Sequence, residues 1–216
     1  MTNYFTKPET KKMIKKAVEG YSKFLGLSEI GLKNIAGYGW YIDGGITMGY
    51  TTQLMEKAVN GDNEFLDNFF VKYYRENINS LIEILKNRQD SRQKIIVEAL
   101  DCHNEQKYYA STLLFLSQAD GICNGQLYRT KKEKEALKKF LSKSENGNFI
   151  NILLRMITDE SAIDVGYSKK ESFDSKLNRH AVVHGLDLNF GSEINSLKAF
   201  SLLCFVSDFV NRYKKL

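Results

Sequence analysis

The chain has 216 residues, of which 43% are hydrophobic and 26% charged, a balance typical of a soluble globular protein with its own core. Its formal net charge of +5 permits binding to a polyanion but does not require it. No apolar run approaches the roughly 20 residues of a membrane span, and no apolar signal-peptide core precedes Lys11 and Lys12. We therefore expect a cytoplasmic protein that does not enter a membrane.

Apolar residues spaced three or four apart indicate helices in the first part of the chain. Their spacing and the flanking turn residues predict helices over residues 8–26, 46–59 and 62–88. Residues 27–45 are rich in glycine and aromatic residues, which predicts a short helix followed by turns. Trp40 lies in this segment, and we expect it to cover the core.

After a break near Asp90 the helical pattern continues to the end of the chain. It predicts helices over residues 92–105, 108–123, 131–141, 149–158 and 173–184, an irregular segment at 163–170, and a last helix from 192 onward. No stretch shows the alternation of a strand. The sequence therefore predicts an all-α helical bundle. Residues 1–90 would form an N-terminal helical region and residues 91–216 the main bundle, unless the two make one continuous domain.

The three cysteines are Cys102, Cys123 and Cys204. They are widely spaced and odd in number, so neither a disulfide framework nor a zinc site of the usual spacing is expected. We expect each of them to be a small buried hydrophobic residue.

Residues 178–185 read Asn-Arg-His-Ala-Val-Val-His-Gly and hold two of the three histidines beside an arginine. In a helix, Arg179, His180 and His184 would lie on one face, because side chains three and four positions apart are neighbours. A guanidinium presents a planar array of donors that fits a phosphate, and an imidazole gains or loses a proton near neutral pH. The segment is therefore the candidate site for phosphate chemistry.

Four residues separate Arg179 from His184, and the polar His180 follows the arginine directly. This spacing resembles the Rx4-6H motif of the HEPN superfamily, helical proteins that include RNA-cleaving toxins and abortive-infection factors. The His-Gly end of the motif and the closing helix downstream strengthen the resemblance, which extends over residues 91–216. Segments 92–126 and 178–209 also resemble bacterial proteins of unassigned function, whereas residues 1–90 match nothing in the superfamily.

The resemblance implies a metal-independent endoribonuclease, a hydrolase in which the ribose 2′-OH attacks the adjacent phosphate without a cofactor. His184 would act as general base or acid, and Arg179 would stabilise the charge that develops on the phosphorane. His180 and Asn178 would orient the phosphate or assist a second proton transfer. The implied partners are RNA, a second copy in a homodimer whose motifs meet across a cleft, and an antitoxin or regulatory protein.

Three alternatives use the same residues. Arg179 and His184 would merely cap a helix that ends at Gly185, because cations there interact favourably with the helix dipole. A non-catalytic module would use the same face to bind a protein or a nucleic acid. A metal site would use the HxxxH pair. The third ligand would then come from Cys102, His103 or Asp187; Ala181 stands where a zinc protease of the HExxH type has glutamate.

Overall fold

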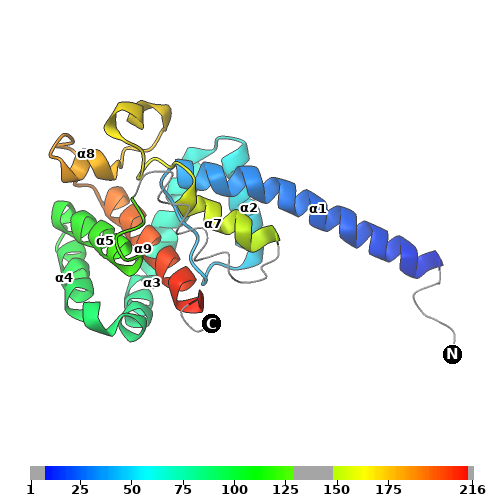
Figure 1. Ribbon diagram of the computed structural model, residues 1–216, viewed down its shortest axis with the longest axis horizontal. Coiled ribbons are helices and arrows are strands. Elements are labelled where there is room, and N and C mark those ends of the chain that lie inside the picture. The colour runs from blue at the N-terminus through cyan, green and yellow to red at the C-terminus, as the bar shows by residue number, and fades with distance from the viewer. Residues whose placement is uncertain (1–7, 129–147, 214–216) are drawn as a thin grey trace.

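The computed structural model describes residues 8–128 and 148–213, and every regular element in these two ranges is a helix. Figure 1 shows their arrangement. In chain order the elements are α1 (Pro8–Gly37), α2 (Met48–Val59), α3 (Asn63–Arg88), the 3₁₀ turn η2 (Asp90–Arg92), α4 (Gln93–Asn104), α5 (Tyr108–Ile122), α7 (Asn148–Thr158), the 3₁₀ segment η3 (Tyr167–Ser172), α8 (Arg179–Val183) and α9 (Glu193–Tyr213). The prediction of an all-α helical bundle is confirmed.

Helix α9 forms the centre of the bundle. It packs mainly against α5 and also against α3, and it is buried on all sides from Asn195 to Ser207. A helix buried around its whole circumference belongs in a core, and α9 buries polar side chains such as Ser196 and Lys198 together with its apolar ones. One buried apolar cluster joins residues on both sides of Asp90, including Leu66 and Phe70 of α3 and Leu203 of α9. The division at residue 90 stays a prediction.

Several predicted helix ends are confirmed. The side chain of Asp62 accepts a hydrogen bond from the Phe65 amide at 3.2 Å, which caps the start of α3. Gly61 supplies the positive φ of 70° that the preceding turn requires. Cys123 and Cys204 are buried as expected, whereas Cys102 is partly exposed. The helix predicted over residues 131–141 lies outside the described residues.

Helix α1 is longer than predicted, because it passes through Gly26 and ends at Gly37. A glycine inside a helix is unfavourable by roughly 1 kcal/mol relative to alanine, which packing of one face can offset. Leu32 and Ile35 are fully buried in this extension. A Cβ atom on Gly31 would lie 2.5 Å from the Cβ of Met55, so the glycine allows α2 to approach α1 closely.

Helix α8 is shorter than predicted. The apolar pattern suggested a helix over residues 173–184, but α8 comprises only the five residues from Arg179 to Val183. Asn178 has an extended backbone (φ −125°, ψ 114°) and its side chain caps the new start. Part of the segment expected to be irregular instead forms η3.

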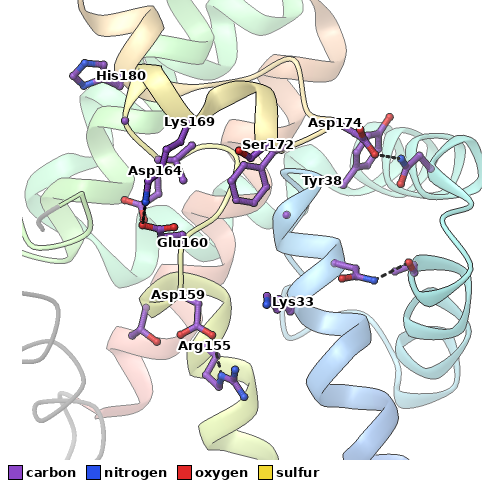
Figure 2. A pocket seen from close by; sticks show the side chains of 18 of the residues that line it. Lys33, Tyr38, Arg155, Asp159, Glu160, Asp164, Lys169, Ser172, Asp174 and His180 are labelled. Carbon is purple, nitrogen blue, oxygen red and sulfur yellow. Dashed lines mark hydrogen bonds and ion pairs between the residues drawn. The ribbon is translucent and has the colours of Figure 1, made fainter. Parts of the chain in front are cut away.

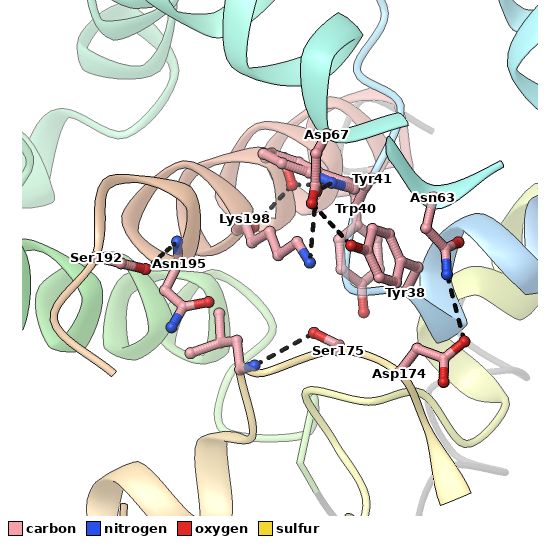
Figure 3. A network of polar contacts seen from close by, with 12 residues as sticks. Tyr38, Trp40, Tyr41, Asn63, Asp67, Asp174, Ser175, Ser192, Asn195 and Lys198 are labelled. Carbon is pink, nitrogen blue, oxygen red and sulfur yellow. Dashed lines mark hydrogen bonds and ion pairs between the residues drawn. The ribbon is translucent and has the colours of Figure 1, made fainter. Parts of the chain in front are cut away.

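Trp40 covers the core as predicted, and a polar network holds it in place (Figure 3). The Trp40 indole N–H donates to Asp67 Oδ1 at 2.8 Å, and the Tyr38 hydroxyl donates to Asp67 Oδ2 at 2.7 Å. The Nζ atom of the buried Lys198 lies 3.8 Å from Asp67 Oδ1 and 3.9 Å from the centroid of the Tyr38 ring. The network joins α9, α3 and the turn after α1.

Lys198 makes the stability of the protein depend on pH. Its burial lowers the pKa of the ammonium to about 8, against 10.5 for an ordinary lysine. Between these two values the unfolded chain binds more protons than the folded one, so this group makes the free energy of unfolding rise with pH. Relative to Lys198→Met, we expect the wild type to gain roughly 2 kcal/mol between pH 7.5 and about 9.5.

The measurement is urea unfolding of both proteins across that pH range. The comparison isolates Lys198, because the buried Cys204 thiol, whose pKa is raised by desolvation, acts in the opposite direction in both proteins. Parallel pH curves for the two proteins would contradict the assignment.

Candidate active site

The motif residues lie on the surface, on α8 and at its end. His184 is the residue that ends the helix, and Gly185 follows with a φ of +67°. The ring centroids of His180 and His184 are 4.4 Å apart. His184 is exposed and His180 is half-buried. The structure thus brings the two imidazoles together at a position that a substrate can reach.

The guanidinium of Arg179 stacks on an aromatic ring. Its Cζ atom lies 4.8 Å from the centroid of the Tyr128 ring, and the Tyr128 hydroxyl donates to the Leu116 carbonyl at 3.3 Å. The backbone N–H of Arg179 donates to the Ile163 carbonyl at 2.9 Å. Within the part of the chain that the structure describes, no carboxylate pairs with the Arg179 side chain. Among the described residues, its N–H donors are therefore not taken up by a carboxylate.

Tyr128 is a site residue that the sequence did not reveal. Desolvation by burial raises its pKa well above the usual 10 of a tyrosine, so the ring that carries the guanidinium stays neutral. A cation held over an aromatic face is stabilised by about 0.5–2 kcal/mol. No spacing rule links a residue after α5 to one at the start of α8, so no sequence signal was available.

Asn178 holds the motif in place. It is only 4% exposed. Its side-chain NH₂ donates to the carbonyls of Ala162 and Val165, both at 2.9 Å, and its side-chain oxygen accepts from the Ala181 amide at 2.9 Å. Both donors are used within the fold, so we assign Asn178 the role of positioning α8 against the segment before it.

Replacing Asn178 by alanine is expected to lower the free energy of unfolding by roughly 3 kcal/mol. Each lost hydrogen bond removes about 1 kcal/mol, and two buried carbonyls would be left without these donors. Thermal and urea unfolding measure the change, with Asn189→Ala, at an exposed position in the loop after α8, as the matched control. A loss below 1 kcal/mol would show that the hydrogen bonds do not hold the motif.

A large groove begins beside His180. It has a volume of about 1460 Å³, and its walls come from the end of α1, from α7 and from the segment that leads to α8. Figure 2 shows His180 at one end of it, above Lys169 and Asp164. Two of its basic side chains form ion pairs: Arg155 with Asp159 at 2.9 Å, and Lys169 with Glu160 at 2.8 Å.

Several exposed apolar side chains lie close to the motif in the chain or on α5, which contacts α8. We call them the apolar rim: Tyr109 and Leu113 of α5, Val183 of α8, Leu186, Leu188 and Ile194. Leu188 is 75% exposed. The Tyr109 hydroxyl donates to the Leu188 carbonyl at 3.1 Å, which joins the two parts of the rim. Exposed large apolar side chains, where they adjoin, are typical of an interaction site.

The alternative metal site lacks a third ligand in the described part of the chain. Among the described residues, no three side chains of His, Cys, Asp or Glu lie close enough to hold an ion. His103 is buried away from the motif, with its Nδ1 atom 2.9 Å from the Ser196 hydroxyl, and desolvation lowers its pKa. The side-chain oxygen of Asp187 accepts from the Asn189 amide.

The position of His184 fits the capping alternative, but the dipole of α8 is too weak to make such a cap important. His184 does follow the last turn of α8. However, a helix of five residues aligns few peptide dipoles, so little stabilisation comes from a cation at its end.

Comparison of the chain with protein-family models, with curated proteins and with solved structures found no match in any of the three. No helix within the described ranges has both the length and the apolar content to cross a membrane.

Proposed function

We propose that the protein is a metal-independent endoribonuclease of a bacterial defence or toxin system, with Arg179 and His184 as its catalytic residues. One observation carries the proposal: two imidazoles with ring centroids 4.4 Å apart lie at the surface, and the residue before His180 is an arginine that no described carboxylate neutralises. An arginine and two histidines in contact with each other supply both functions that phosphodiester transfer needs, charge stabilisation and proton transfer.

The reaction is an intramolecular transfer at phosphorus. An imidazole, His184, takes the proton of the ribose 2′-OH as the 2′-oxygen forms its bond to phosphorus. Arg179 stabilises the negative charge on the non-bridging oxygens. The bond from phosphorus to the 5′-oxygen then breaks, and that oxygen receives a proton from the second acid, for which His180 is the nearest group. The products are a 2′,3′-cyclic phosphate and a 5′-hydroxyl end.

The apolar rim supports the expected homodimer. Its side chains flank the motif, so a second copy that covers the rim would place its own Arg179 and His184 near those of the first. Burial of such side chains contributes about 25 cal/mol per Å² of apolar surface. Two motifs facing one another would enclose the phosphate from both sides.

A charge in the rim is expected to separate the dimer. Sedimentation velocity of the wild type should show a dimer and that of Leu188→Asp a monomer, because an unpaired carboxylate is unfavourable in an apolar interface. Met48→Asp is the control, since Met48 is also exposed but lies at the start of α2 and is not part of the rim. A monomeric wild type would remove the dimer from the proposal.

The test of function is cleavage of single-stranded RNA by the purified chain in EDTA, with the ends of the products identified by mass spectrometry. The wild type should yield 2′,3′-cyclic phosphate ends, and Arg179→Ala should be slower by about 10²–10³-fold. Absence of cleavage, a requirement for a divalent metal, or equal rates for the two proteins would overturn the proposal.

The apolar rim also favours a second candidate, a non-catalytic module that binds a protein partner such as an antitoxin through this face. The same assay separates the two candidates. A module of this kind would show no cleavage, and Leu188→Asp would abolish its binding, whereas Arg179→Ala would leave its apolar contacts in place.

A further inference from the structure

The first half of α1 projects from the bundle and lacks a partner within the described part of the chain. Helix α1 has 30 residues, and those it buries lie only between Ser28 and Ala36. Residues 11–23 are all exposed. At 1.5 Å per residue this exposed part extends about 20 Å, and Figure 1 shows it pointing away from the other helices.

The exposed half carries the same apolar face that the other half buries. Val18, Leu25 and Leu32 are spaced by seven residues, as are Ala17, Phe24 and Gly31. Seven residues make almost two helical turns, so each series stays on one face. We call the exposed part the N-terminal stripe: Met13, Ile14, Ala17, Val18 and Tyr21. Met13 is 72% exposed and Val18 is 59% exposed, which is unusual for a continuous row.

The direction of this face excludes a flat membrane surface as the occupant. Further along α1 the same face contacts α2 and α7. Gly31 packs on Met55, and the rings of Phe24 and Phe149 are 5.0 Å apart. The body of the protein therefore stands on the side toward which the stripe faces. A planar bilayer in contact with the stripe would collide with that body, whereas a helix could extend the layer of α2 and α7.

The charge of the segment indicates an acidic occupant. Between Pro8 and Lys23 the sequence has five lysines and two glutamates, a net charge of +3. Lys11 and Lys12 lie in the first turns of α1, where the helix dipole already contributes positive potential. An anionic partner would reduce both the repulsion among the lysines and the positive potential at the start of the helix. A second copy would instead bring another +3 against this surface.

We propose that the N-terminal stripe is a docking surface for an acidic amphipathic helix of a partner protein. The apolar face of that helix covers Val18 and its neighbours, and its carboxylates pair with Lys11, Lys15 and Lys16, which border the stripe by helical position. This inference concerns a surface remote from Arg179 and does not depend on RNA cleavage.

The test uses the full chain and a synthetic peptide of three heptads, with leucine at two positions of each heptad and glutamate on both flanks. Fluorescence anisotropy should show that the wild type binds this peptide. The same peptide with lysine in place of glutamate should bind at least about tenfold more weakly. Val18→Asp should weaken binding of the acidic peptide by about tenfold or more.

The matched control is Ile30→Asp. Ile30 is 55% exposed on the same helix but lies two residues from the buried Leu32, on a different face, so this variant should bind like the wild type. Circular dichroism of both variants checks that α1 stays helical. Three results would each overturn the proposal: no binding of the acidic peptide, a dimer that Val18→Asp dissociates, or wild-type binding to phosphatidylglycerol vesicles that Val18→Asp abolishes.

Discussion

Replacing His184 by alanine is expected to slow RNA cleavage by about 10²–10⁴-fold, the usual contribution of a positioned imidazole to proton transfer. Its side chain is exposed, and within the described residues its only side-chain contact shown is with the His180 ring. The thermal midpoint should therefore stay within about 1–2 °C of the wild type. Initial rates in EDTA and differential scanning calorimetry give the two quantities.

The two readouts separate catalysis from structure. Asn189→Ala, in the same exposed loop, is the control and should retain both the rate and the midpoint. A His184→Ala protein that cleaves at the wild-type rate would place the chemistry elsewhere. A His184→Ala protein that unfolds at a much lower temperature would instead make the residue a structural cap.

Trp40→Ala is expected to lower the free energy of unfolding by about 4 kcal/mol, the largest effect on stability that we predict. The side chain is fully buried, and its ring stacks on Phe70 with centroids 4.9 Å apart. Truncating a buried tryptophan leaves a cavity and typically destabilises by about 3–5 kcal/mol. Asp67 would also lose one of its hydrogen-bond donors. Urea unfolding followed by circular dichroism is the measurement, because Trp40 is the chain's one tryptophan.

One further substitution separates the hydrogen bond of Trp40 from its apolar contacts, and a second serves as the control. Trp40→Phe keeps much of the apolar contact but removes the N–H, so it should destabilise by about 1–2 kcal/mol. Tyr50→Ala removes an exposed aromatic ring on α2 and should change the free energy by less than about 1 kcal/mol. A loss below 2 kcal/mol for Trp40→Ala would show that the core closes around the gap.

Helices whose signals are local were predicted well. In α3 the cap Asp62, the repeated apolar positions and the stop after Arg88 all lie within the segment itself. In α9 the density of apolar residues indicated burial before any partner was known. The wrongly predicted helix boundaries lie where one local signal conflicts with another or with packing. Gly26 suggested an end that packing of α1 overrides, and the apolar spacing before Asn178 suggested a helix that its capping side chain delays.

The site shows the same division. The motif Arg179, His180 and His184 could be found from its spacing, and so could the idea that two imidazoles adjoin. The support for Arg179 could not be found in this way, because Tyr128 reaches it only through the tertiary fold. The spacing also did not show that the side-chain NH₂ of Asn178 donates its hydrogen bonds to the carbonyls of Ala162 and Val165.

The sequence by itself determined that this protein is helical, where most of its helices run, and which residues could carry phosphate chemistry. These properties follow from periodicity and caps, which act over a few residues. The tertiary structure decided where α1 ends, how short α8 is, and which side chains support the motif. Within the described residues, it also left half of α1 without a covering helix. Such outcomes depend on contacts between segments far apart in the chain, whose packing energies exceed the local preferences of a single turn.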